Sequence, residues 1–206
     1  MAKIIKAILP PKRPGTKTLV IFADGTTKKY LPNVVADQGL FPGMELTEAA
    51  LEVLEKANAA ASAKQRAVRI ISAAGVSKRD LERRLTQKGE SPEDAKNAVA
   101  WLSDLNLLDD AETARQIVAR GVSRGYGPER IRQMLYQKQI PKHLWEEALE
   151  TIPDMSEALT DFLRKRLGED PDEKTLRSAT QAAIRWGYSW SEVRSALEAL
   201  QKDMDE

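Results

Sequence analysis

The sequence has 206 residues, with 32 Lys and Arg against 31 Asp and Glu, no cysteine and a single histidine, His143. The lack of thiols excludes disulfides and thiolate metal sites, and one imidazole leaves little material for a histidine-based catalytic triad or a zinc site. No apolar run is long enough to span a bilayer, so we expect a cytoplasmic protein that has no membrane segment. We also expect no cofactor, metal or catalytic residues.

The first 46 residues differ in pattern from the rest of the chain. Three short strands are predicted where β-branched and aromatic residues cluster, at residues 3–9, 18–22 and 27–31. Asp24-Gly25 suits the positive backbone angles of a tight hairpin loop, so the second and third strands should pair as antiparallel neighbours. Pro10-Pro11 and Pro14-Gly15 separate the first two strands. A small β-hairpin or sheet is therefore expected at the N-terminus.

From Thr47 onward the spacing of apolar residues is that of helices. Thr47 is placed to cap a helix that runs towards Asn58, and a further helix is predicted from Ala63 onward. Its apolar face recurs at i, i+3, i+4 and i+7, with Ala67, Ile70, Ile71 and Ala74. Gly75 should end this helix, and Ser77 is placed to cap the next. A third helix follows Ser91, which completes a three-helix unit.

This three-helix unit recurs along the chain. Adding 50 to the residue number carries Leu81 and Leu85 onto Ile131 and Leu135, and it carries the apolar positions of the third helix, residues 95–102, onto residues 145–152. Adding 98 finds a third and weaker copy. The copies predict a mainly α fold in which three tandem three-helix repeats share apolar surface and form an elongated curved rod. We divide the chain into an N-terminal β-rich region with a linking helix and three repeats, at residues 1–60, 61–110, 111–153 and 154–206.

Charge is unevenly distributed. Residues 1–152 hold 24 Lys and Arg against 19 Asp and Glu, whereas residues 153–206 hold 8 against 12. The most polarised stretch that we identify, residues 115–142, holds seven basic residues against Glu129 alone. Such a stretch suits a phosphate backbone or an acidic protein surface, and an ordinary solvated helical face is the alternative. The predicted basic binding face consists of Arg79, Arg83, Lys88, Arg115, Arg120, Arg124, Arg130, Arg132 and Lys138.

Two features have both a structural and a functional interpretation. Asp109 and Asp110 lie where a helix begins, so we expect them to cap free N–H groups and not to form a metal site or a catalytic pair, and contact with a partner is the alternative. Tyr126, between two glycines, is expected to pack between repeats, and stacking on a base is the alternative. For Trp186 we expect an exposed or inter-repeat position.

The segment from Leu105 to Ala114 resembles the RecX family of bacterial recombination regulators through its Leu-Asp-Asp-x-x-x-Ala pattern. The segments 77–89 and 125–135 also agree, and the β-rich start, with residues 39–46, is similar to the N-terminal extension of longer family members. The resemblance therefore covers nearly the whole chain and is weakest in the third repeat. The residues that carry the family motif are Leu108, Asp109, Asp110, Ala114, Gly127, Ile131 and Leu135.

The resemblance implies a non-enzymatic regulator that binds the RecA–DNA filament. Such a protein would modulate, and chiefly inhibit, the recombinase and ATPase activities of RecA in recombination, DNA repair and the SOS response. Its expected partners are RecA and, in addition, single- or double-stranded DNA, and we expect a monomer. A DNA-binding protein that affects RecA only by competing for DNA is the first alternative, and a helical scaffold unrelated to recombination is the second.

Overall fold

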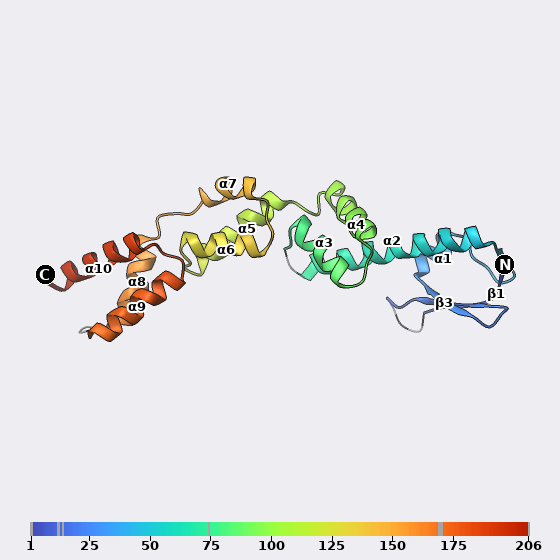
Figure 1. Cartoon of the computed structure of the whole chain (residues 1–206), viewed down its shortest axis with the longest axis horizontal. Coiled ribbons are helices and arrows are strands. Elements are labelled where there is room, and N and C mark those ends of the chain that lie inside the picture. The colour runs from blue at the N-terminus through green and yellow to red at the C-terminus, as the bar shows by residue number, and fades with distance from the viewer. Residues whose placement is uncertain (1, 12, 14, 74, 169–170, 206) are drawn as a thin grey trace. The chain divides into compact units, whose positions relative to one another are not determined.

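The computed structural model describes residues 2–11, 13, 15–73, 75–168 and 171–205, with side chains described up to residue 202 (Figure 1). Pro14 and Ala74, to which the sequence assigns a strand break and a helical apolar position, lie outside the described residues. The chain divides into two compact units, Met1–Ala74 with Leu81–Leu107 and Gly75–Asp80 with Leu108–Glu206. Within the described part, no helix has the length and apolar character needed to cross a membrane.

The first unit begins with a four-stranded antiparallel sheet in the order β3-β2-β1-β4. Its strands are β1 (Lys3–Leu9), β2 (Thr18–Phe22), β3 (Thr27–Tyr30) and β4 (Glu45–Leu46). The three predicted strands and the hairpin pairing of β2 with β3 are confirmed, and the third strand ends one residue earlier than predicted. β4 escaped prediction because two residues are too few to show a strand period.

The sheet packs against the first half of a long helix. A short helix, α1 (Pro32–Asp37), leads towards α2 (Glu48–Ala73), beside which the sheet lies in Figure 1. The Tyr30 hydroxyl donates to Glu55 Oε1 at 2.9 Å, and the Leu31 N–H donates to Asn58 Oδ1 at 2.9 Å. Fully buried Phe22 and Leu54 belong to the same apolar cluster. The sheet thus obtains from α2 the apolar cover that a sheet of this size needs for stability.

The two helices predicted on either side of residue 60 form one continuous helix of 26 residues. The alanine-rich stretch between them contains no glycine or proline, so nothing interrupts the helical hydrogen bonds. Thr47 accepts from the Ala50 N–H at 3.2 Å, as its predicted capping role requires. The second half of α2 packs on α4 (Pro92–Asp104), and Arg66 Nε donates to Glu90 Oε1 at 2.7 Å.

The described residues of the second unit form helices and the loops that connect them. It contains α5 (Asp110–Ser123), α6 (Pro128–Gln137), the 3-10 turn η1 (Lys142–Leu144), α7 (Trp145–Leu149), α8 (Ser156–Leu167), α9 (Glu173–Arg185) and α10 (Trp190–Asp205). Two apolar clusters form its core, one around Val118 and Leu135 and the other around Leu163 and Ala183. Helix α3 (Lys78–Gln87) divides between the units: its first three residues and the turn before it, Gly75–Asp80, belong to this unit, and the rest of the helix belongs to the first.

One predicted helix is shorter than its sequence pattern indicates. The apolar positions from Trp145 to Ile152 predict a continuous helix, whereas α7 ends at Leu149. Pro153 disfavours helical backbone at the residue before it, and the chain therefore leaves the helix early. Ile152 still packs against the apolar cores of the second unit from its position after the helix.

The α6 and α9 helices meet end to end at two glycines. The Gly127 N–H at the start of α6 donates to the carbonyl of Trp186 at 2.9 Å, and the Glu129 N–H donates to the carbonyl of Gly187 at 3.1 Å. A side chain on Gly127 would overlap the backbone of Gly187 and Tyr188. Gly187 has a φ of +97° and would meet Arg130 in the same way. Only glycine allows this approach.

A related contact joins the start of α3 to the end of α6. The Ser77 hydroxyl donates to the carbonyl of Lys138 at 2.6 Å and accepts from the Asp80 N–H at 3.1 Å. Ser77 precedes Gly127 by 50 positions and Lys138 precedes Trp186 by 48, close to the spacing of the predicted repeats. The serine therefore caps its own helix, as predicted, and also satisfies a free carbonyl of another.

We expect Gly127→Ala to destabilise the second unit by about 1–3 kcal/mol, because the added methyl group forces the α6 and α9 termini apart. Thermal unfolding monitored by circular dichroism should show a midpoint lower by about 2–4 °C for each kcal/mol. Gly75→Ala is the control, since its methyl group would meet only Gln116 Oε1 at an ordinary 3.6 Å. Equal midpoints for the two variants would contradict the role assigned to this contact.

Candidate interaction surface

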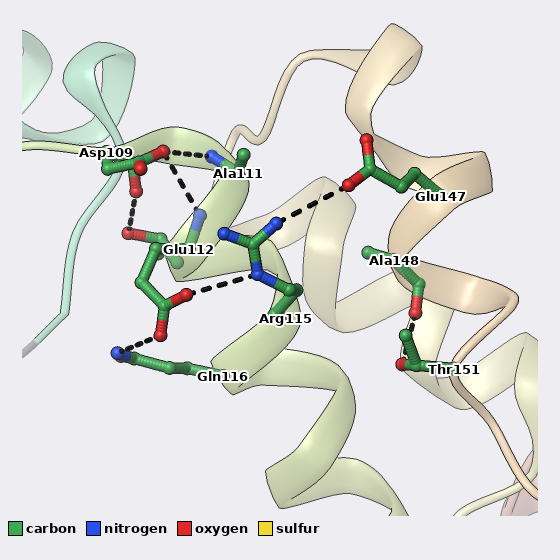
Figure 2. A network of polar contacts seen from close by, with 9 residues as sticks. Asp109, Ala111, Glu112, Arg115, Gln116, Glu147, Ala148 and Thr151 are labelled. Atoms are coloured by element: carbon green, nitrogen blue, oxygen red, sulfur yellow. Dashed lines mark hydrogen bonds and ion pairs between the residues drawn. The ribbon is translucent and has the colours of Figure 1, made fainter.

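The stretch with the strongest charge and the family motif lie mainly on α5 and α6. Asp109 is the N-cap of α5, where its Oδ1 accepts from the Ala111 N–H at 2.8 Å and from the Glu112 N–H at 3.1 Å (Figure 2). The hydrogen bond from Glu112, followed by that from Ala111, lowers the pKa of Asp109 below its ordinary value. Asp109 therefore stays ionised in its predicted capping role.

Asp110 caps a different helix from its neighbour. Its side chain is buried, and Oδ1 accepts from the Lys78 N–H at 2.8 Å, in the first turn of α3. Residue 78 is far from residue 110 in sequence, so local pattern alone gave no sign of this partner. The adjacent carboxylates thus point to two separate helix termini, which is a structural arrangement and not that of a metal site or catalytic pair.

The remaining motif residues have structural roles as well. Ala114, Ile131 and Leu135 are fully buried where α5 packs on α6, and Leu108 is nearly so. Gly127 forms the close backbone contact with Gly187. The family motif therefore specifies how this part of the chain folds, and a binding surface must be sought among the exposed residues.

Two of the predicted basic residues are neutralised by carboxylates. Arg115 Nε lies 3.1 Å from Glu112 Oε2, and Arg115 Nη1 lies 3.5 Å from Glu147 Oε1 on α7 (Figure 2). Arg132 pairs with Glu129 one turn earlier on α6. These contacts hold the guanidinium groups in place and reduce the positive charge that they offer to a partner.

Arg120 and Arg124 form the uncompensated part of the basic stretch. Both are exposed and one turn apart at the end of α5, and among the described residues neither has an ion-pair partner. Arg130 is also exposed, and its Nη1 donates to the neutral Gln133 Oε1 at 3.4 Å, which leaves its charge intact. Lys138 is half-buried.

The other predicted basic residues belong to α3. Arg79 lies in the part of α3 assigned to the second unit, whereas Arg83 and Lys88 belong to the first unit, and all three are exposed. Their membership in one continuous binding face with Arg120 and Arg124 stays a prediction.

Tyr126 packs against a ring from the end of α9, which confirms its expected packing role. The ring centroids of Tyr126 and Trp186 are 5.2 Å apart, with an interplanar angle of 73°. The ring centroid of Phe162, on α8, lies 4.8 Å from that of Trp186. Sequence reasoning missed Phe162 and the neighbouring Arg166, because both lie in the acidic last quarter of the chain.

The sequence of this surface matches a known family. Residues 109–149 match the model described as RecX, second three-helix domain. The regulatory protein RecX of Chromohalobacter salexigens is 32% identical over 135 residues, which cover 64% of this chain and 88% of that protein. Regulatory protein RecX of Xanthomonas campestris pv. campestris strain B100 is 33% identical over 135 residues, which cover 64% of this chain and 83% of that protein.

Solved structures show the same fold. A crystal structure of regulatory protein RecX covers 95% of this chain and 99% of its own length, with a TM-score of 0.67 and 22% identity. RecX from Lactobacillus salivarius covers 70% of this chain and 98% of its own, with a TM-score of 0.60 and 20% identity. Because the chain is 32–33% identical to RecX proteins of which it covers 83–88%, it belongs to the RecX family of regulatory proteins.

Proposed function

We propose that this protein binds the filament that RecA forms on DNA and lowers the recombinase and ATPase activities of RecA. The observation that carries the proposal is the coincidence of the family-matched segment with an exposed pair of uncompensated arginines, Arg120 and Arg124. The action is binding without catalysis. It requires RecA and DNA as partners and no cofactor.

The contact surface that we propose is centred on the end of α5. Cations without intramolecular partners keep their full attraction for an acidic surface, whereas paired cations must first give up a carboxylate. Arg120 and Arg124 are therefore placed at the centre of the surface, and Arg115 and Arg132 contribute less. Its proposed extensions within the second unit are Arg79, Arg130 and Lys138, and Arg83 and Lys88 are proposed as separate contacts made by the first unit.

The first test is the ATPase activity of RecA on single-stranded DNA, with this protein titrated well below the RecA concentration. We expect inhibition at these substoichiometric levels, under conditions in which the protein barely binds bare DNA. Binding to bare DNA is measured by fluorescence anisotropy in the same buffer. Inhibition that begins only when the DNA itself is saturated would favour the competing interpretation, in which RecA is displaced from its DNA.

The second test reverses the charge of the proposed contact residues. Arg120→Glu with Arg124→Glu should weaken binding to the preformed RecA filament on the order of tenfold or more, because repulsion replaces attraction at an acidic surface. Co-sedimentation with filaments measures the affinity, and thermal unfolding should be nearly unchanged because neither side chain has a partner in the described structure.

The control carries the same charge change elsewhere in the same unit. Arg177 and Arg194 are each paired with a glutamate one turn away, at 2.6 Å and 2.9 Å. Arg177→Glu with Arg194→Glu should leave filament binding within about twofold of the original, since these exposed pairs are worth little individually. If both double variants lose binding equally, net charge alone is responsible and the proposed surface is wrong.

A further inference from the structure

A continuous series of ring and guanidinium contacts joins three helices of the second unit. Arg130 of α6 lies over the Tyr126 ring at 5.8 Å, and Tyr126 packs edge-on against Trp186. Trp186 contacts Phe162 of α8, and Arg166 lies over the Phe162 ring at 4.5 Å. The series therefore has three rings in its middle and an arginine at each end. We call it the ring series.

The three aromatic residues pack within the second unit and are each only partly buried. Tyr126, Phe162 and Trp186 are each half-buried, so part of every ring remains in contact with solvent. Phe162 and Trp186 pack on the apolar cluster of α8, α9 and α10, while the Tyr188 hydroxyl donates to the carbonyl of Gly125 at 2.9 Å. The rings are thus fixed before any ligand arrives, which reduces the entropy lost on binding.

The two arginines at the ends of the ring series are not neutralised by any described carboxylate. Arg130 and Arg166 are exposed, and no carboxylate of the described chain forms an ion pair with either. Two acidic residues on the same helices are occupied by other arginines, Glu129 by Arg132 and Asp161 by Arg164, and Glu169 and Asp170 lie outside the described residues. Arg166 lies in the acidic last quarter of the chain, so this local positive charge is invisible in the regional balance.

We propose that the ring series is a binding site for single-stranded DNA. Guanidinium groups at the two ends would contact phosphates, and the exposed parts of the rings would contact bases, which is the combination that single-stranded nucleic-acid sites use. A duplex hides its base faces, so only its phosphates would be in reach. The site extends the proposed function to direct DNA contact, but its test needs no RecA and succeeds or fails independently.

The first experiment measures anisotropy of a fluorescein-labelled oligothymidylate with the full chain. Arg130→Gln with Arg166→Gln should weaken binding on the order of tenfold, and the slope of log K against log salt should become less steep by about 1.4, since about 0.7 is lost for each single-strand phosphate contact. The matched control, Arg177→Gln with Arg194→Gln, removes two arginines that are paired with glutamates and should keep the slope.

The second experiment tests the contact of bases with the rings. Oligothymidylate should quench the tryptophan emission of the original protein and of Trp190→Phe, but the quenching should be lost in Trp186→Phe. Trp190 is a suitable control because it is 65% exposed at the start of α10 and takes no part in the ring series. A duplex of the same length should cause little quenching.

Several results would overturn the proposal. Equal weakening by the two double variants would show a general charge effect, and quenching that survives in Trp186→Phe would place the bases elsewhere. Equal quenching by duplex would exclude base contact. If the glutamine variant unfolds, Arg130→Lys with Arg166→Lys keeps both charges and should retain the original salt slope, so a reduced slope in a folded lysine variant would also count against the site.

Discussion

The second unit depends on the meeting of helix ends at Gly127 and Gly187. The first N–H groups of α6 have no partner within their own helix, and neither do the last carbonyls of α9. Because glycine at both positions allows close approach, each end satisfies the other directly. The positive end of the α6 dipole then faces the negative end of α9. Ser77 makes the corresponding contact with the carbonyl of Lys138, with its side-chain hydroxyl in place of a backbone N–H.

This end-to-end contact also determines where aromatic side chains gather. The turn that carries Gly127 holds Tyr126, and the turn that carries Gly187 holds Trp186, so joining the turns brings the two rings together. Phe162 completes the cluster from α8. A contact required for folding therefore creates a half-exposed aromatic surface, and a single arrangement can serve both stability and binding.

Charge in this protein has to be judged pair by pair. The stretch of residues 115–142 is strongly basic in sequence, yet Arg115 and Arg132 are held by glutamates, of which Glu147 lies on a different helix. No described carboxylate pairs with Arg120, Arg124 or Arg130, so their charge is not compensated in the described structure. Arg166 joins them functionally in our proposal although its region of the chain is acidic. Regional charge is thus a weak guide to a binding face, because pairing depends on distances of a few ångströms.

The sequence by itself determined the helical pattern from Thr47 onward, the hairpin at Asp24-Gly25 and the capping roles of Thr47, Ser77 and Asp109, because each depends on residues within about one turn of one another. Family membership was also readable, since its motif consists of buried and turn-forming residues in a fixed local order. The tertiary structure decided the partner of Asp110, the pairing of Arg115 with Glu147, and the assembly of Tyr126, Phe162 and Trp186. These contacts join residues from 24 to 60 positions apart, and their formation depends on how whole helices pack, for which local periodicity carries no signal.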